Sequence, residues 1–247
     1  EIMKSVKIVG QTWMVENLNV DKFRNGDIIP EVKTNEEWMR IGDEGKPAWC
    51  YYENKKENGA IYGKLYNWYA VNDPRGLAPE GWRIPSKEDW NMLTKFVGST
   101  GMVGKKLKST AYWKSPNAGA TNDYNFSFMP GGQRHPLGNF IQFGESGVFW
   151  TTTVGGLTNS ASSPTFDNAT STAIAYDQTM SSGRSVRCVR DKTEEIKAVF
   201  NAISVKIGNQ EWTASNLDVS RFRNGDPIFE AKTNEEWKRA GEEKKPA

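Results

Sequence analysis

Few residues in this chain have the chemistry of a nucleophile or a general base. The 247 residues include one histidine and two cysteines. The histidine, His135, lies in GGQRHPLGN between an arginine and a proline. That setting is typical of a solvated loop residue, whereas a hydrolytic triad needs a base that a third group orients. The sequence therefore predicts no catalytic residue, and we expect the protein not to be an enzyme.

The two cysteines, Cys50 and Cys188, leave two states open. A disulfide between them would close a long loop and stabilise the fold by about 3–5 kcal/mol. Two buried free thiols are equally common in protein cores. Cys188 lies in the alternating stretch SVRCVR, where a strand would give it a structural role.

Aromatic and polar residues in the second half of the chain have the chemistry of a sugar-binding face. Sugars stack their C–H faces on aromatic rings, while amides, carboxylates and guanidinium groups hold their hydroxyls. We expect Trp82, Trp113 and Trp150 to fill the core instead. The predicted ligand-binding residues, all expected in exposed loops, are Tyr112, Asp123, Tyr124, Arg134, His135, Asp167 and Tyr176.

A metal site has little support in the sequence. One histidine and two cysteines offer few ligands for zinc. Calcium needs six to eight oxygen ligands, and the candidates in one polar segment are Asn159, Asp167, Asn168 and Asp177. That segment lacks a Glu-Pro-Asn or Gln-Pro-Asp triplet. We therefore predict no cofactor and no metal, and leave only a structural calcium ion open.

The overall composition excludes two classes of partner. The formal net charge is +2, and lysines and arginines are scattered along the chain. This pattern lacks the basic patch of a nucleic-acid-binding protein. No apolar run approaches the roughly 20 residues that a membrane-spanning helix needs, so we predict no membrane span.

The elements that position these residues follow from turn signals and periodicity. Val6, Ile8, Trp13 and Val15 alternate around a predicted turn at Gly10-Gln11, which indicates a hairpin, and Asn25-Gly26 indicates a tight turn. Three helices are predicted: one from a Thr34 cap through Ile41, one over about 62–72, and one from a Ser86 cap to Gly98. In the third helix the residues expected to face the core are Trp90, Leu93, Phe96 and Val97.

After Gly98 the pattern changes to short alternating runs. NFSFMPGGQR, VFWTTT, AIAYDQ and SVRCVRD are rich in β-branched and aromatic residues, which predicts antiparallel strands. VGGLTNSASSPTFDNATST is polar and without periodicity, which predicts a long loop. Helices followed by a series of strands indicate an α+β domain.

Residues 5–48 recur at 204–247, with about two-thirds of the positions identical. We therefore divide the chain into a complete domain at 1–191, a linker at 192–203 that forms a short helix or an extended connector, and the opening part of a second, truncated repeat at 204–247. We expect the second copy to keep its hairpin and short helix. It also offers a surface for self-association.

Several stretches, taken in order, resemble a known family. VKIVGQTWMVENLN, FRNGD, YGKLYNWYAV, LAPEGWRIPSKEDW, PGGQR, GVFWTTT and SVRCVRD resemble the Fibrobacter succinogenes major paralogous domain, which is common in secreted and surface proteins of Bacteroidetes and Fibrobacteres. More distantly, GWRIPSKEDW and SVRCVRD are similar to the formylglycine-generating-enzyme branch of C-type lectin-like folds. The resemblance implies two main helices on twisted antiparallel sheets, with the last strand next to the first. The catalytic cysteine motif of that enzyme is not matched.

These observations lead to two expectations for function. The first is a non-enzymatic, exported adhesion or binding module at a bacterial cell surface, which recognises a glycan or a surface protein. The second is a structural repeat of a surface or filament assembly that binds no small ligand.

Overall fold

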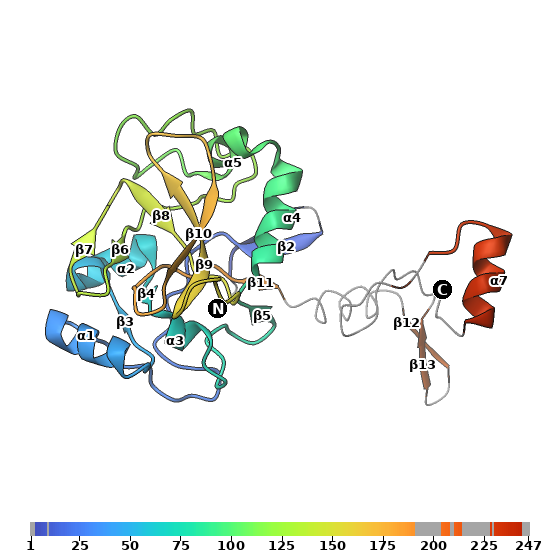
Figure 1. The fold of residues 1–247 in the computed structure, drawn as a ribbon, viewed down its shortest axis with the longest axis horizontal. Coiled ribbons are helices and arrows are strands. Elements are labelled where there is room, and N and C mark those ends of the chain that lie inside the picture. The colour runs from blue at the N-terminus through green and yellow to red at the C-terminus, as the bar shows by residue number, and fades with distance from the viewer. Residues whose placement is uncertain are drawn as a thin grey trace. The chain divides into compact units, whose positions relative to one another are not determined.

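The computed structural model describes residues 3–8, 10–190, 204–207, 210–213, 228 and 230–243. The chain forms two compact units, 1–190 and 191–247. The first unit combines helices with several small antiparallel sheets, which agrees with the predicted α+β class (Figure 1). The linker predicted at 192–203 lies outside the described residues.

A four-stranded antiparallel sheet joins the two ends of the first unit. Its strands, in spatial order, are β1 (Ser5–Ile8), β2 (Gln11–Met14), β11 (Val189–Arg190) and β5 (Trp82–Arg83). The predicted N-terminal hairpin is confirmed, because β1 pairs with β2. Val189 of β11 pairs with Trp13, so the last strand lies beside the second strand of the hairpin and not beside the first.

A three-stranded antiparallel sheet has the order β10–β9–β8. Its strands are β8 (Ser146–Val148), β9 (Ser160–Asp167) and β10 (Ile174–Thr179). The loop predicted over 154–172 is therefore wrong, because β9 lies inside it. Serines and a proline give β9 little intrinsic strand preference, yet it pairs on both sides, and packing context outweighs that preference.

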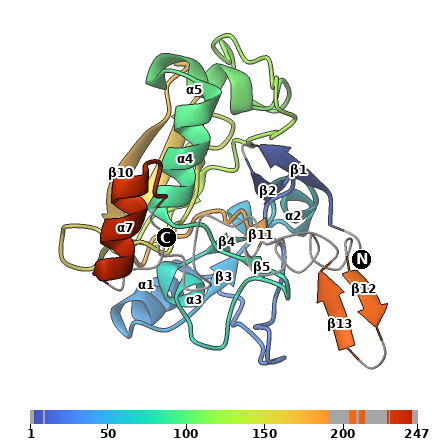
Figure 2. The same ribbon diagram turned by 90° about the vertical axis from the view of Figure 1, so that its right-hand side faces the viewer.

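The helix predicted from Ser86 to Gly98 is confirmed as α4 (Lys87–Val97). Its capping box is complete, because the Ser86 side chain accepts from the Asp89 N–H and the Asp89 side chain accepts from the Ser86 N–H. Phe96 does not face the core; it is 51% exposed, and its ring lies 6.1 Å from that of Tyr124. Helix α5 (Thr100–Leu107), which was not predicted, follows α4, and both lie beside the β8–β9–β10 sheet (Figure 2).

The single helix predicted over 62–72 is wrong. The chain there forms the end of α2 (Lys56–Tyr62), strand β4 (Leu65–Tyr66) and the short helix α3 (Trp68–Val71). Gly63 ends α2 with a φ of +72°, and a Cβ atom there would lie 2.7 Å from the Leu18 carbonyl oxygen. Asn67 then caps α3. A short run of buried residues does not distinguish one helix from two elements.

The remaining elements of the first unit are short. The helix predicted from the Thr34 cap is confirmed as α1 (Asn35–Asp43). Strand β3 (Trp49–Cys50) pairs with β4, and the 3₁₀ turn η1 (Tyr52–Asn54) precedes α2. Strands β6 (Gln133–Arg134) and β7 (Phe140–Ile141) form a separate hairpin. The turn predicted at Asn25-Gly26 is confirmed by the positive φ of Gly26, +93°.

The core of the first unit is divided into three aromatic clusters. Their central members are Trp150 with Tyr66, Trp13 with Phe128, and Trp38 with Tyr52. Trp82, Trp113 and Trp150 are all buried, as predicted.

Cys50 and Cys188 are both free thiols, and they lie in different core clusters. Of the two states that the sequence left open, the structure has the free thiols and no bridge. Burial raises the pKa of each thiol to about 12. Both side chains therefore pack as small apolar groups.

The second unit repeats the start of the first. Strands β12 (Ser204–Ile207) and β13 (Gln210–Thr213) form a hairpin, and α7 (Asn234–Glu242) begins at a capping box of Thr233 and Glu236. The predicted hairpin and short helix of the second copy are thus confirmed. Within the described part of both units, no helix is long and apolar enough to cross a membrane.

Candidate functional site

A polar depression of about 380 Å³ lies over the β8–β9–β10 sheet. Its buried lining includes Ser146, Val148 and Arg184, and its exposed lining includes Glu145 and Tyr176. Its remaining lining residues, polar and mostly half-buried, are Gln133, Gln142, Thr165, Asp167, Asn168 and Gln178. We call this depression the Arg184 groove.

The strand register explains why these side chains meet. Alternate residues of a strand share one face, and residues directly opposite in an antiparallel pair share it too. Thr165 and Asp167 of β9 therefore lie on the same face as their partners Val148 and Ser146 in β8. On the other side of β9, Tyr176 of β10 lies opposite Ser163.

Arg184 is held on this same face of the sheet. Its side chain donates to Ser163 Oγ at 2.9 Å and to Gln178 Oε1 at 2.7 Å. The guanidinium carbon lies 5.0 Å from the centre of the Trp150 ring, a cation–π arrangement. Main-chain hydrogen bonds in both directions with Tyr66 fix the backbone of Arg184.

Arg134 is not an exposed ligand-binding residue, as the sequence had suggested. Its relative exposure is 0%, and its guanidinium donates to the carbonyl oxygens of Gly138, Val32 and Thr34 at 2.6–2.9 Å. The carbon of this group also lies 4.6 Å from the Trp38 ring. Arg134 therefore joins the β6–β7 hairpin to the start of α1, and its role is structural.

Arg187 has a similar structural role. It is fully buried and donates to the Asn17 side chain and to the carbonyl oxygens of Phe126 and Ser127. It thus ties the segment after β2 to the loop that precedes β6. Burial lowers the pKa of Arg187 to about 9.

The rim of the groove is built from amides and paired charges. Gln133 Nε2 donates to Gln142 Oε1 at 2.6 Å. Gln142 has a φ of +62°, a left-handed conformation uncommon for residues other than glycine. Glu145 forms a 2.8 Å ion pair with Lys114. The Asp167 carboxylate accepts from the main-chain N–H groups of the following turn at Ala169 and Thr170.

The seven predicted ligand-binding residues do not form one face. Asp167 and Tyr176 line the Arg184 groove. Tyr112 is 54% exposed and lines another depression, of about 290 Å³, with Asn19 and Ile61.

The other predicted residues lie elsewhere. Asp123 is exposed, and the half-buried Tyr124 packs on Phe96 of α4. His135 starts the turn between β6 and β7, where its Nδ1 accepts from the Leu137 N–H at 3.2 Å. We predicted a common site because these residues are close in sequence, but they lie on separate elements of the fold.

Sequence reasoning missed Arg184 and the three glutamines of the groove. Gln178 had a usable signal, because it lies two residues after Tyr176 in the predicted strand AIAYDQ and so shares its face. Arg184 had no such signal, because Arg187 lies in the same segment and has a structural role. The sequence alone does not distinguish these two arginines. Gln133 and Gln142 meet only through the pairing of β6 with β7.

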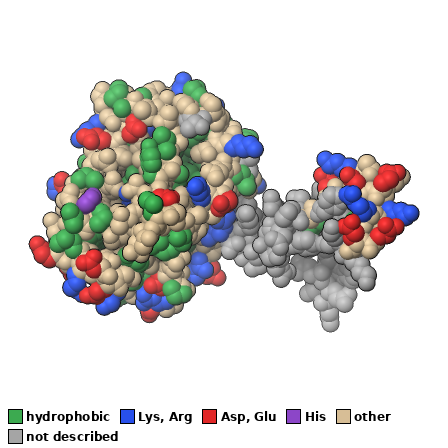
Figure 3. Space-filling view, viewed as in Figure 1, with side chains coloured by type: hydrophobic (Ala, Val, Ile, Leu, Met, Phe, Trp, Pro, Cys, Tyr) green, Lys and Arg blue, Asp and Glu red, His purple; other side chains and the backbone are tan. Residues whose placement is uncertain are grey.

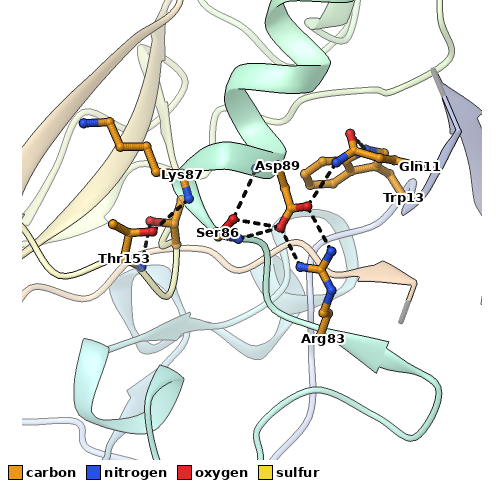
Figure 4. Close-up of polar contacts among 8 residues, drawn as sticks. Gln11, Trp13, Arg83, Ser86, Lys87, Asp89 and Thr153 are labelled. Atoms are coloured by element: carbon orange, nitrogen blue, oxygen red, sulfur yellow. Dashed lines mark hydrogen bonds and ion pairs between the residues drawn. The ribbon is translucent and has the colours of Figure 1, made fainter. Parts of the chain in front are cut away.

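A second buried charge cluster surrounds Asp89 (Figure 4). The Asp89 carboxylate accepts from Arg83 at 2.5 and 2.9 Å, from Gln11 at 3.1 Å and from the Ser86 N–H at 2.8 Å. Burial raises the pKa of Asp89, but the hydrogen bonds from Arg83 and Ser86 outweigh it, so the pKa lies below the ordinary 3.8. A carboxylate saturated in this way joins β2, β5 and α4 and does not act as a base.

The carboxylates of two candidate calcium ligands already accept main-chain hydrogen bonds. Asp167 accepts from Ala169 and Thr170, while Asp177 accepts from the Gly156 N–H at 2.7 Å. No group of three or more histidine, cysteine, aspartate or glutamate side chains suited to a metal ion occurs within the described ranges.

On the visible surface of the first unit, charges of both signs are interspersed with apolar groups (Figure 3).

Comparison with known proteins supplies one match. The family profile of the Fibrobacter succinogenes major domain matches residues 6–190. Searches of curated proteins and of solved structures found no match. The matched range runs from β1 to the end of β11 and so covers the whole first unit. The chain therefore belongs to the Fibrobacter succinogenes major domain family.

Proposed function

We propose that the first unit is a non-enzymatic binding module that holds a glycan in the Arg184 groove. The observation that carries the proposal is Tyr176, which is 47% exposed and lines a depression rich in amide, hydroxyl and carboxylate groups. A sugar ring would stack on the tyrosine, and its hydroxyls would bond to the surrounding polar groups.

The size and polarity of the groove support this ligand class. Its volume of about 380 Å³ falls within the range of small-molecule sites. Gln178 and Gln142 each offer an amide that can both donate to and accept from a hydroxyl. The Gln133–Gln142 hydrogen bond keeps one such amide oriented.

The state of the chemically reactive groups supports binding without catalysis. Both cysteines are buried, and a thiol whose pKa is raised to about 12 is a poor nucleophile near neutral pH. Asp89 is saturated by donors, and His135 accepts a hydrogen bond within its own turn. The formylglycine-generating reaction would need reactive cysteines in an accessible groove.

We also propose an exported, cell-surface location and a C-type lectin-like arrangement. The family membership of residues 6–190 supports both, because the resemblance seen in the sequence implies them. Two capped helices, α1 and α4, correspond to the two expected main helices. Strand β11 pairs with β2 and not with β1, but it joins the same sheet as β1, which supports the part of the expected topology that brings the two ends of the unit together. A surface protein that carries glycans would then be the natural partner.

A glycan array probed with the labelled full chain tests the binding proposal. Tyr176→Ala should weaken the strongest signals about fivefold, which corresponds to about 1 kcal/mol of stacking. Tyr112→Ala is the matched control, since Tyr112 is similarly exposed but lines a different depression. Equal loss in both variants, or no bound glycan at all, would refute the proposed site.

A second candidate function, a structural repeat in an assembly, rests on the second unit. Trp237 of α7 is 63% exposed, whereas its counterpart in the first unit, Trp38, is 1% exposed and donates to the Ser181 carbonyl oxygen at 3.0 Å. A large aromatic side chain that is buried in one copy and exposed in the other suits a contact with another protein surface.

Light scattering of the full chain over a concentration series tests this second candidate. Assembly through α7 would raise the average mass with concentration, and Trp237→Ala would abolish the rise. Lys238→Ala, an exposed change on the same helix, is the control. A constant monomer mass in all three proteins would exclude assembly through this helix.

A further inference from the structure

We propose that the glycan held in the Arg184 groove is acidic and places one carboxylate, as a uronic acid does, against the Arg184 guanidinium. This inference rests on the proposed function and deepens it by naming the ligand class. Three observations carry it: the incomplete hydrogen bonding of Arg184, the ion pairing around the groove, and the burial of the guanidinium.

Arg184 has fewer partners than the other two buried arginines. A guanidinium carries five N–H donors. Arg134 donates to four main-chain carbonyl oxygens, and Arg187 uses three of its nitrogens on Asn17, Phe126 and Ser127. Arg184 donates only to Ser163 and Gln178 among the described residues, and its Nε has no partner there.

The donors left over are Nε–H and one N–H on each Nη nitrogen. Ser163 occupies one N–H of Nη1 and Gln178 occupies one of Nη2, so both partners fix the plane of the guanidinium. Nε–H and the remaining Nη donors lie in that same plane. A planar carboxylate accepts two parallel N–H bonds from one edge of a guanidinium, and a neutral hydroxyl accepts only one well-aligned bond there.

Arg184 has no carboxylate partner in an ion pair among the described residues, although Glu145 and Asp167 also line the groove. Glu145 is paired with Lys114 at 2.8 Å. Asp167 lies near the buried Lys108, whose pKa is lowered by burial and raised by the Asp167 charge. Arg184 forms no ion pair with a carboxylate of the described residues, and burial alone lowers its pKa, to about 9. A ligand carboxylate would supply the ion-pair partner that Arg184 lacks among the described residues.

Burial makes this unmatched charge significant. Arg184 is 2% exposed yet lines the groove, so a ligand that enters would bring a counter-charge into contact with it away from bulk water. An ion pair is stronger in such surroundings than at an open surface. Surface lysines around the rim offer no equivalent, because water screens them.

The test uses pairs of glycans that differ only in charge. Oligosaccharides containing uronic acids are printed on an array beside their carboxyl-reduced, neutral forms and probed with the full chain. We expect the acidic member of a bound pair to bind at least tenfold tighter than the neutral member, and added salt to change that difference only slightly, because salt screens buried ion pairs much less than exposed ones. Calorimetry with the same pair in solution, and with the methyl ester of the acid, provides affinities.

Two variants test whether Arg184 causes the preference for the acidic member of a glycan pair. Arg184→Gln should bind the acidic and neutral members about equally, while Tyr176→Ala should weaken both by a similar factor. Circular dichroism checks that each variant folds. If Arg184→Gln is unfolded, the unaltered protein with the acid and its methyl ester still decides the question, because that comparison needs no substitution.

The outcomes separate this inference from the proposed function. Equal binding of acidic and neutral members would overturn the acidic ligand and leave glycan binding intact. Binding of neither member of any pair would overturn both. An acidic preference that persists unchanged in Arg184→Gln would place the carboxylate elsewhere and overturn the assignment to Arg184.

Discussion

Three buried arginines illustrate how residues of one type take different roles in this protein. Arg134 and Arg187 each connect distant segments by donating mainly to buried main-chain carbonyl oxygens. Arg184 lines a polar groove, and its Nε–H has no hydrogen-bond partner among the described residues. The difference lies in the acceptors around each side chain and not in the sequence near it.

Arg134→Leu should destabilise the first unit by about 3 kcal/mol or more, because the carbonyl oxygens of Gly138 and Val32 lose their arginine donor inside the fold. Arg40→Leu, at a side chain that is 56% exposed and paired with Glu44, should change stability by less than about 0.5 kcal/mol. Urea unfolding followed by tryptophan fluorescence measures both. Similar small losses in the two variants would mean that Arg134 is not a structural residue.

Cys50 and Cys188 should both resist alkylation in the native protein. Their thiols are fully buried, and burial raises their pKa to about 12, so little thiolate forms at neutral pH. After unfolding without a reductant, intact-mass spectrometry should show two labels per chain. A protein that takes up no label when unfolded, with a mass lower by the two hydrogens of a bridge, would contradict the free-thiol state.

At the scale of elements, the segment from β5 to α4 is the clearest case of a short sequence with a fixed structure. In GWRIPSKEDW, Arg83 pairs with Asp89, Ser86 caps the helix, and Trp90 enters the core. The Asp89 carboxylate therefore serves both as a helix cap and as a link between three elements. Its loss should affect the whole first unit.

Asp89→Asn should destabilise the protein by about 2–3 kcal/mol near neutral pH, because Arg83 loses its charged partner. The folded-state pKa of Asp89 lies below 3.8, so its ionised form stabilises the fold above that pH and the contribution disappears as pH falls through the folded-state pKa. The difference in unfolding free energy between the wild type and the variant should thus be constant above about pH 5 and should disappear as the pH falls below 3.8.

Unfolding free energies measured across pH 2.5–7 test this behaviour, with Asp123→Asn at an exposed carboxylate as the control. If Asp89→Asn and the wild type have equal unfolding free energies at pH 7, or if their difference increases in acid, the assigned role of the carboxylate is wrong.

Helices with caps could be predicted from the sequence, while the central strand and most of the groove could not. Thr34 and Ser86 mark helix starts by local hydrogen bonds, which nearby residues determine. Strand β9 has serines at buried positions, and only its pairing with β8 and β10 makes it a strand. The contact of Arg184 with Ser163 joins the segment after β10 to β9, so it also depends on how the sheet forms.

At the scale of the whole molecule, the four-stranded sheet brings together strands from both ends of the first unit. Strand β11 ends at Arg190 and pairs with both β2 and β5, so the sheet needs no residue from the second unit. The family match over 6–190 has the same extent. We therefore expect the first unit to fold without the second copy of the opening segment.

Deletion of residues 193–247 should leave a folded first unit whose melting temperature changes by less than about 2 °C. Differential scanning calorimetry of the shortened and full chains makes the comparison. If the shortened chain is unfolded, the second unit supplies structure that the first unit lacks, and the division after residue 190 is wrong.

The measurement that tests the central claim most directly is an NMR titration of the full chain with a glycan selected on the array. Two-dimensional spectra resolve the side-chain amides and the arginine Nε–H groups as well as the backbone. We predict that the largest shifts will fall on the Arg184 Nε–H, the side-chain amides of Gln142 and Gln178, and the backbone of Tyr176. Shifts confined to the depression around Tyr112, with these groups unchanged, would contradict the account.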